Sequence, residues 1–160
     1  MPQIFSVAEL VKVAVEDERS GVAFYSTLAE VVNGPKVKRI MVALAEEEKV
    51  HQRRFEEILR DLGNVKVPER YEDEYASYLE ALTSSRAFPN QETACKVARE
   101  CPDDAAAIDT ANRFERDTLI LMNEMRSKAP QRHAEIIEEL IREEQGHLVT
   151  LTRARAALTT

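Results

Sequence analysis

Several residue types that define other classes of protein are scarce in this chain. Its 160 residues include four glycines, six prolines, two cysteines and no tryptophan. Five residues lie between Cys95 and Cys101 and there is no second pair, which excludes a four-cysteine iron site and a Cys-x-x-Cys redox motif. Two cysteines also do not make a disulfide scaffold, so we expect them to be plain structural residues of a protein in a reducing cytoplasm.

Long apolar runs and an excess of positive charge are missing as well. No apolar stretch approaches the about 20 residues that a membrane-spanning helix needs. Residues 1–5 lack the basic and apolar regions of a signal peptide. The formal net charge of −7 argues against nucleic acid or an anionic membrane as a partner. We therefore expect a cytoplasmic protein that binds neither.

Alanine, leucine, valine, glutamate and arginine are abundant instead. Together with the few glycines and prolines, this is the composition of a mostly helical protein. The length suits one domain that buries a real core, so we predict a single all-α domain over residues 1–160.

The first part of the chain is predicted to form a helical hairpin, residues 6–62. Ser6 and Glu9 have the spacing of a capping box, which starts a helix, and apolar residues follow at helical spacing. This helix is expected to end at residues 33–35, Asn-Gly-Pro, where the glycine can adopt a left-handed cap and the proline cannot continue the helix. A second helix is expected over residues 35–61 after this short turn.

A long connection, residues 63–102, separates this hairpin from a second one, residues 103–158. Two short helices are expected in the connection, over residues 71–86 and from Asn90 to residue 99. The second hairpin is expected to consist of one helix over residues 103–126 and another after Pro130, whose apolar stripe extends to Leu158.

Two Glu-x-x-His motifs stand out, and each is preceded by a single glutamate at nearly the same distance. The two single glutamates lie 97 residues apart and the two motifs 96 apart, which fits a duplicated hairpin with one residue lost in a turn. The six candidate ligands are Glu18, then Glu48 with His51, then Glu115, and then Glu144 with His147.

The positions of these six residues indicate a metal site. They fall on the apolar stripes of the four long helices, and an inward carboxylate costs several kcal/mol unless it is paired or bound to a cation. No lysine or arginine occupies the matching inward positions. Two divalent cations would balance the four carboxylates, since the imidazoles are neutral ligands.

The spacing of the same residues gives the expected geometry. A glutamate and a histidine three residues apart project from one face of a helix, so each motif can reach one metal ion, and a carboxylate can bridge two ions. We predict a carboxylate-bridged two-metal site in a four-helix bundle, suited to iron or manganese rather than to tetrahedral zinc. The alternative is a helical scaffold whose site is degenerate or filled with zinc.

Other polar residues receive weaker predictions. His133, near the start of the fourth helix, is expected on the surface. Glu46, Glu47 and Glu143 neighbour the candidate ligands but lie off the apolar stripe, so we expect them to be solvated. Tyr25 lies two turns beyond the first single glutamate on the same face, where it either packs in the core or supplies a hydrogen bond or proton beside the metals.

Five segments that are distributed over nearly the whole chain resemble the rubrerythrin branch of the ferritin-like superfamily. They are residues 18–25, 46–51, 71–75, 114–117 and 143–147. The resemblance implies a ferritin-like four-helix bundle with a long, partly helical crossover. It also implies a homodimer, since members commonly dimerise and some exchange helices. The implied non-haem di-iron centre is ligated by Glu18, Glu48, His51, Glu115, Glu144 and His147.

Two departures from rubrerythrin affect the expected chemistry. The rubredoxin domain is absent, so turnover would need an external electron donor, a rubredoxin-like protein or another reductase. Rubrerythrins also carry an additional carboxylate three residues after the third-helix ligand, and Thr118 occupies that position here. This change makes the site more symmetric and closer to that of bacterioferritin.

The expected function is that of a di-iron oxidoreductase that reduces hydrogen peroxide or dioxygen, an activity that belongs to the response to oxidative stress. The cofactor is expected to be two iron ions, with an iron–manganese or manganese pair as the other possibility. One alternative is a ferroxidase that handles iron as ferritins do. Another is oxygen activation for hydroxylating an organic substrate, which a sizeable pocket beside the metals would favour.

Overall fold

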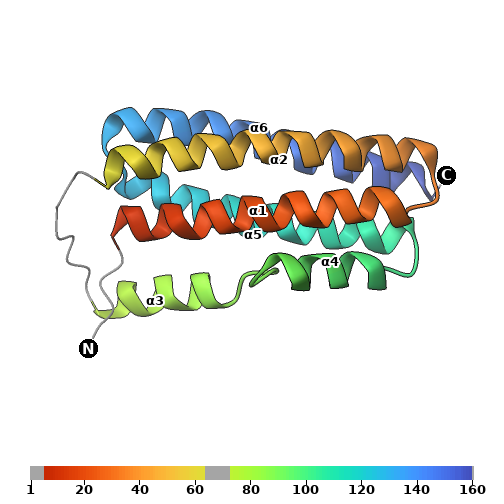
Figure 1. Cartoon of the computed structure of the whole chain (residues 1–160), viewed down its shortest axis with the longest axis horizontal. Coiled ribbons are helices and arrows are strands. Elements are labelled where there is room, and N and C mark those ends of the chain that lie inside the picture. Colours follow the sequence, from red (N-terminus) through yellow and green to blue (C-terminus); the bar gives the residue numbers. More distant parts are fainter. Residues whose placement is uncertain (1–5, 64–72, 160) are drawn as a thin grey trace.

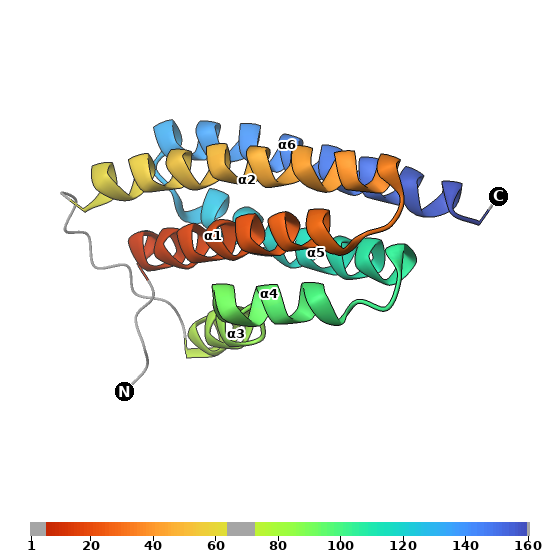
Figure 2. The same ribbon diagram turned by 45° about the vertical axis from the view of Figure 1, so that its right-hand side comes forward.

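The computed structural model describes residues 6–63 and 73–159, and most of these residues are helical. Helices α1, α2, α5 and α6 run side by side as a four-helix bundle, while α3 and α4 form a further layer against α1 and α5 (Figures 1 and 2). The predicted all-α fold with a four-helix bundle and a partly helical crossover is therefore confirmed. The helices are α1 (Val7–Val31), α2 (Pro35–Leu62), α3 (Asp73–Ser84), α4 (Gln91–Glu100), α5 (Asp104–Lys128) and α6 (Gln131–Ala157).

The first helix begins and ends near the predicted residues. The Ser6 side chain accepts a hydrogen bond from the Glu9 N–H, and the Glu9 carboxylate accepts one from the Ser6 N–H, at 2.8 Å, so the capping box is confirmed. The predicted left-handed glycine cap is wrong, because no glycine with a positive φ occurs in the described residues and Gly34 is extended. Gly34 is instead required by a close approach, since a Cβ there would lie 2.8 Å from Asp104 Oδ2.

This close approach joins the two hairpins. The N–H groups of Asn33 and Gly34 donate to the two carboxylate oxygens of Asp104, at 2.8 and 2.7 Å. Asp104 lies in the first turn of α5, where a carboxylate also interacts favourably with the helix dipole. The turn between α1 and α2 is therefore fixed to the start of the second hairpin.

The second hairpin differs in detail from the prediction. Asp103 caps α5 by accepting from the Ala106 N–H at 2.8 Å, and the helix continues to Lys128, two residues beyond the predicted end. The prediction that Leu158 extends the inner stripe of α6 is wrong. Leu158 is 44% exposed, because α6 projects past the other helices before it ends (Figure 2).

The crossover covers one side of the bundle. Asn90 caps α4 as predicted, accepting from the Thr93 N–H. Of the helix expected over residues 71–86, residues 71–72 lie outside the described part, and the helix ends at Ser84. Phe88, between the two short helices, packs against Phe24 of α1 and Phe114 of α5, at ring-centroid distances of 4.7 and 5.1 Å. The α1/α5 side is thus covered, whereas α3 and α4 leave the α2/α6 side open (Figures 1 and 2).

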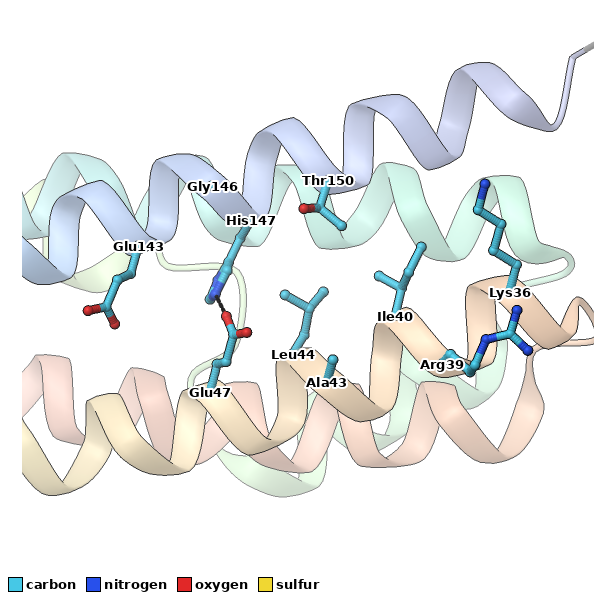
Figure 3. A pocket seen from close by; sticks show the side chains of 10 residues that line it. All are labelled: Lys36, Arg39, Ile40, Ala43, Leu44, Glu47, Glu143, Gly146, His147 and Thr150. Carbon is cyan, nitrogen blue, oxygen red and sulfur yellow. Dashed lines mark hydrogen bonds and ion pairs between the residues drawn. The ribbon is translucent and has the colours of Figure 1, made fainter.

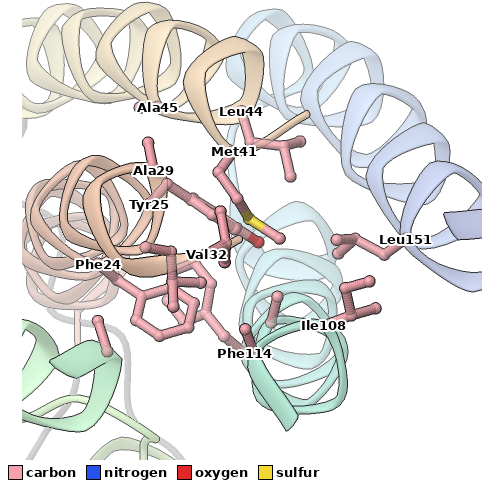
Figure 4. Close-up of a cluster of buried hydrophobic side chains, with 14 of the residues drawn as sticks. Phe24, Tyr25, Ala29, Val32, Met41, Leu44, Ala45, Ile108, Phe114 and Leu151 are labelled. Carbon is pink, nitrogen blue, oxygen red and sulfur yellow. The ribbon is translucent and has the colours of Figure 1, made fainter. Parts of the chain in front are cut away.

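The apolar core has two parts, separated along the bundle by buried polar side chains. One cluster includes Phe24, Met41 and Ile108 (Figure 4), and the other includes Phe55 and Met122. On each long helix the buried glutamates lie in the sequence between the residues of the two clusters. The bundle therefore holds a polar layer between two apolar layers.

Candidate metal centre

The polar layer consists of two overlapping groups of side chains. Within each group, one nitrogen or oxygen atom of every residue lies within 4.8 Å of the corresponding atoms of the others. Two of the glutamates belong to both groups, and all the members are at most 3% exposed. The structure thus brings all six predicted residues together. The first group is Glu18, Glu48, His51 and Glu144, and the second is Glu48, Glu115, Glu144 and His147.

The two motifs face each other from antiparallel helices. His51 on α2 and His147 on α6 stack, with ring centroids 5.4 Å apart and an interplanar angle of 17°. Their Nδ1 atoms point inward and lie 2.7 and 2.8 Å from the two carboxylate oxygens of Glu144. One carboxylate therefore lies between two imidazoles, and one nitrogen of each ring faces the cluster.

The hydrogen bonding of these residues fits a bound cation pair. Both carboxylate oxygens of Glu18, Glu48 and Glu144 are buried without a hydrogen-bond partner, and so is the Nδ1 atom of each histidine. In the described part of the chain, the four carboxylates have no ion pair with lysine or arginine. Buried carboxylates left without partners are costly, and divalent cations would supply the missing partners.

In the absence of cations, protons bound to the carboxylates and imidazoles offset the negative charge of the cluster. Burial and the neighbouring carboxylates raise the pKa of Glu18 well above its ordinary range. Burial and the charge of Glu144 raise the pKa of Glu115 to about 8. Burial lowers the pKa of His51, but the Glu144 carboxylate 2.7 Å from its Nδ1 and the other nearby negative charges outweigh this effect and raise the pKa to about 9. Burial likewise lowers the pKa of His147, but the close carboxylates of Glu115, Glu144 and Glu48 outweigh this effect and raise it. Metal binding must therefore displace protons from the cluster.

Two further carboxylates hold the histidines from outside. His51 Nε2 lies 2.9 Å from Glu143 Oε2, and His147 Nε2 lies 2.5 Å from Glu47 Oε2. Both glutamates are solvated, as predicted, but the prediction missed their contacts with the histidines. Their side chains are 47% and 55% exposed, but one oxygen of each contacts an imidazole. Glu46 does follow the prediction, as an exposed residue paired with Lys49.

The sequence contained a signal for these two contacts. Each motif is preceded by a second glutamate, so that both have the form Glu-Glu-x-x-His. Because α2 and α6 are antiparallel, the first glutamate of each motif lies beside the histidine of the other helix. Contacts of this kind fix the orientation of a metal-bound imidazole and leave its inner nitrogen free for the metal.

Tyr25, on α1, contacts the cluster through Glu115 of α5. Its side chain is fully buried and its hydroxyl donates a hydrogen bond to Glu115 Oε1. Burial and the charge of Glu115 raise the pKa of the phenol well above its ordinary value, which keeps it protonated. The ring also packs against Phe114, with centroids 6.1 Å apart. Core packing and hydrogen bonding, the two predicted alternatives, therefore both apply.

Comparison with known proteins identifies the family. A family model described as Rubrerythrin matches residues 9–155, which include all six candidate ligands and the crossover. The chain belongs to the rubrerythrin family. No significant match was found among curated proteins or solved structures. The predicted membership in the ferritin-like di-iron branch is confirmed, and the buried cluster is compatible with that branch's metal site.

Two further residues, Thr118 and Gly21, shape the surroundings of the cluster in this rubrerythrin-family chain. Thr118, where rubrerythrins carry an additional carboxylate, is buried and its Oγ1 has no hydrogen-bond partner in the described residues. Gly21 allows α1 to pass close to the cluster, since a Cβ there would lie 2.9 Å from Phe114 Cζ and 3.2 Å from Glu48 Oε2.

His133 is not part of the cluster, but its predicted surface position is wrong. It is 4% exposed and its Nε2 lies 3.5 Å from Asp61 Oδ2 near the end of α2. The spacing explains this burial, because His133 precedes the buried Ile137 by one helical turn on the inner face of α6. Cys95 and Cys101 are free and partly buried, as expected for structural cysteines.

The open side of the bundle carries a groove of about 750 Å³ between α2 and α6 (Figure 3). It reaches Glu47, Glu143 and His147, at the outer edge of the cluster. Such a volume is typical of a small-molecule site. As to membranes, none of the described helices is long and apolar enough to span one.

Proposed function

We propose that this rubrerythrin-family chain is a non-haem di-iron oxidoreductase that reduces hydrogen peroxide or dioxygen with electrons from an external donor. The observation that carries the proposal is the pair of buried ligand groups that share two glutamates. When bound, two ferrous ions would supply one electron each to the oxidant. An iron–manganese or manganese pair would suit the same ligands. The proposed ligands are Glu18, Glu48, His51, Glu115, Glu144 and His147.

The protein's own residues have three tasks in this proposal. The first is to hold the ions. Glu48 and Glu144 belong to both groups and are the proposed bridging ligands. Each histidine would bind through Nδ1, because its Nε2 is already engaged by Glu143 or Glu47. Four carboxylates balance the charge of two divalent ions, so the buried layer becomes neutral when loaded.

The second task is to manage protons. Reduction of peroxide or dioxygen to water consumes protons as well as electrons. Tyr25 donates a hydrogen bond to Glu115 Oε1, and its raised pKa keeps the proton on the phenol between turnovers. We assign Tyr25 the role of hydrogen-bond donor, and of proton donor, on the Glu115 side of the centre.

The third task is to control access. The crossover covers the α1/α5 side, and the groove between α2 and α6 leads to the edge of His147. We assign the entry of a small oxidant to the α2/α6 side. The electron donor is proposed to be a separate rubredoxin-like protein or another reductase. The working assembly is proposed to be a cytoplasmic homodimer.

A second candidate function is that of a ferroxidase that handles iron. The observation that favours it is Thr118, which replaces the additional carboxylate of rubrerythrins and leaves a nearly symmetric ligand set. Assembly size separates the candidates, since a dimer cannot enclose a mineral core and a closed multi-subunit shell can.

The test compares oxidants on protein loaded anaerobically with Fe(II). Stopped-flow absorbance would follow oxidation by hydrogen peroxide and by dioxygen, with His147→Ala as the inactive control. Oxidation that is faster with peroxide than with dioxygen supports the oxidoreductase, provided that a chemical reductant restores the ferrous protein and the cycle can be repeated. Oxidation by dioxygen alone, followed by uptake of further Fe(II), supports iron handling. No oxidation by either oxidant contradicts both.

A further inference from the structure

The groove between α2 and α6 is lined by apolar side chains from α2 and by small residues from α6. Ile40, Ala43 and Leu44 line it from α2, and Gly146 and Thr150 line it from α6 (Figure 3). A Cβ placed on Gly146 would have no atom within 4 Å, so the space beside this residue is open. The small residues Gly146 and Thr150 on α6, together with Ala43 on α2, leave room for a ligand between the two helices.

The charge changes from one end of the groove to the other. Lys36 and Arg39 lie at one end, and Glu47 and Glu143 lie at the other, beside His147 (Figure 3). In the described part of the chain neither cation forms an ion pair, although the chain carries a net charge of −7. At 1.5 Å per residue, Arg39 and Glu47 are separated by about 12 Å along α2.

These features define the chemistry of a ligand. A guanidinium and an ammonium without internal partners suit a carboxylate, which arginine can bind through two parallel hydrogen bonds. The apolar lining suits a hydrocarbon chain, and the volume suits one molecule of moderate size. A second anionic group is disfavoured, because the other end presents Glu47 and Glu143.

We propose that the groove binds a medium-chain monocarboxylate, such as a fatty acid of about ten carbons. Its carboxylate contacts Lys36 and Arg39, and its chain lies along Ile40, Ala43 and Leu44 with the terminal methyl group toward His147. Binding itself requires no metal. Only the consequence that the end of the chain lies beside a redox centre rests on the proposed function.

Isothermal titration calorimetry with decanoate, below its micelle concentration, tests the proposal on the full chain as purified. Lys36→Glu combined with Arg39→Glu should weaken binding by about tenfold or more, because the charge at the head-group end is reversed. Gly146→Leu should weaken binding by narrowing the groove where the methyl end of the chain lies. Lys38→Glu is the matched control, since Lys38 is exposed on the same helix but does not line the groove, and it should leave the affinity unchanged.

Decanol and decyltrimethylammonium serve as control ligands, and both should bind far more weakly than decanoate. Absence of decanoate binding at about 1 mM, equal binding of the three ligands, or unchanged affinity in Gly146→Leu would overturn the proposal. A change in oligomeric state in the groove variants, seen by light scattering without ligand, would also overturn it and identify the groove as a subunit contact. Circular dichroism verifies that each variant is folded.

Photocrosslinking tests the proposed orientation of the ligand in the groove. A decanoate analogue with a terminal diazirine should crosslink near Gly146 and Glu47 on irradiation, as mapped by mass spectrometry, and crosslinks confined to the Lys36 end would overturn the orientation. Metal content measured on the same samples keeps the two proposals separate. Decanoate binding to a protein that takes up no iron would contradict the di-iron function and leave the groove assignment intact.

Discussion

At the scale of single residues, the two histidines of the cluster differ in what supports them. Glu143, which contacts His51, also accepts a hydrogen bond from Arg54 Nη1. Arg54 Nη2 donates to Glu139 at 2.6 Å. Glu47, which contacts His147, has no lysine or arginine partner in the described residues and borders the groove. The His51 side of the centre is therefore the more firmly fixed of the two.

Removing either outer carboxylate should weaken the metal site on its own side. Glu143→Gln and Glu47→Gln each keep the shape of the side chain but lose the charge that orients the imidazole, and we expect metal affinity to fall by about 10- to 100-fold. Anaerobic Fe(II) titration measures this change. Glu46→Gln is the control, since Glu46 is exposed and pairs only with Lys49. Equal affinities for all three variants would show that the outer contacts have no role.

Tyr25→Phe separates packing from proton donation. The ring and its contacts remain, while Glu115 Oε1 loses its donor. We expect unchanged metal content and slower reduction of the oxidant, by about 10- to 100-fold if the phenol supplies a proton. Stopped-flow oxidation of the loaded protein measures the rate. A rate equal to that of the unchanged protein would assign Tyr25 to packing alone.

Two glycines allow a matched comparison. In Gly21→Ala the new methyl group meets Phe114 and Glu48, and Phe114 cannot retreat because Phe88 packs against it, so we expect a loss of about 1–3 kcal/mol in stability together with weaker metal binding. In Gly146→Ala the methyl group meets nothing, so helix propensity should make the change neutral or stabilising by up to about 1 kcal/mol. Urea unfolding measures both. Similar effects in the two variants would contradict the close approach at Gly21.

At the scale of helices, caps and apolar spacing predicted the elements well, because both are local properties. The Ser6 capping box and the Asn90 cap are where the sequence indicated. Contacts between helices were harder to predict. The role of Gly34 depends on Asp104, seventy residues further on, and the contact of Glu47 depends on how α2 and α6 are rotated against each other.

The same distinction applies to the candidate site. All six proposed ligands were predictable, since each lies at an inward position of its own helix and the motifs repeat. The burial of His133 was also encoded in its spacing from Ile137 but was missed, because a lone histidine is usually on the surface. The groove was not predictable, since it depends on how the small residues Gly146 and Thr150 of α6 lie against the lining residues of α2.

At the scale of the whole molecule, the buried acidic layer makes the metal-free protein sensitive to pH. Burial, opposed by Arg86, raises the pKa of Asp17 to about 7, and the pKa values of Glu115 and His51 are raised to about 8 and about 9. All three groups bind protons more tightly in the folded state than in the unfolded state. Their contribution therefore favours folding at low pH and is lost as the pH rises.

We thus expect the free energy of unfolding of the metal-free protein to decrease from about pH 5 to about pH 9. Urea unfolding at several pH values measures this dependence. The loaded protein should show the opposite trend over the same range, because the cations replace the protons and bind more tightly as the ligands deprotonate. A metal-free protein whose stability is constant or increases with pH would contradict the presence of buried carboxylates that are not neutralised by lysine or arginine in the cluster.

The most direct test of the two-metal site is the elemental metal content per chain of protein purified without chelators or nickel. We expect about two ions per chain, both iron or iron with manganese. His51→Ala and His147→Ala should each lose about one ion while the helices remain intact. A content near zero, with no uptake after anaerobic addition of Fe(II), would contradict the site and leave a helical scaffold without metal chemistry.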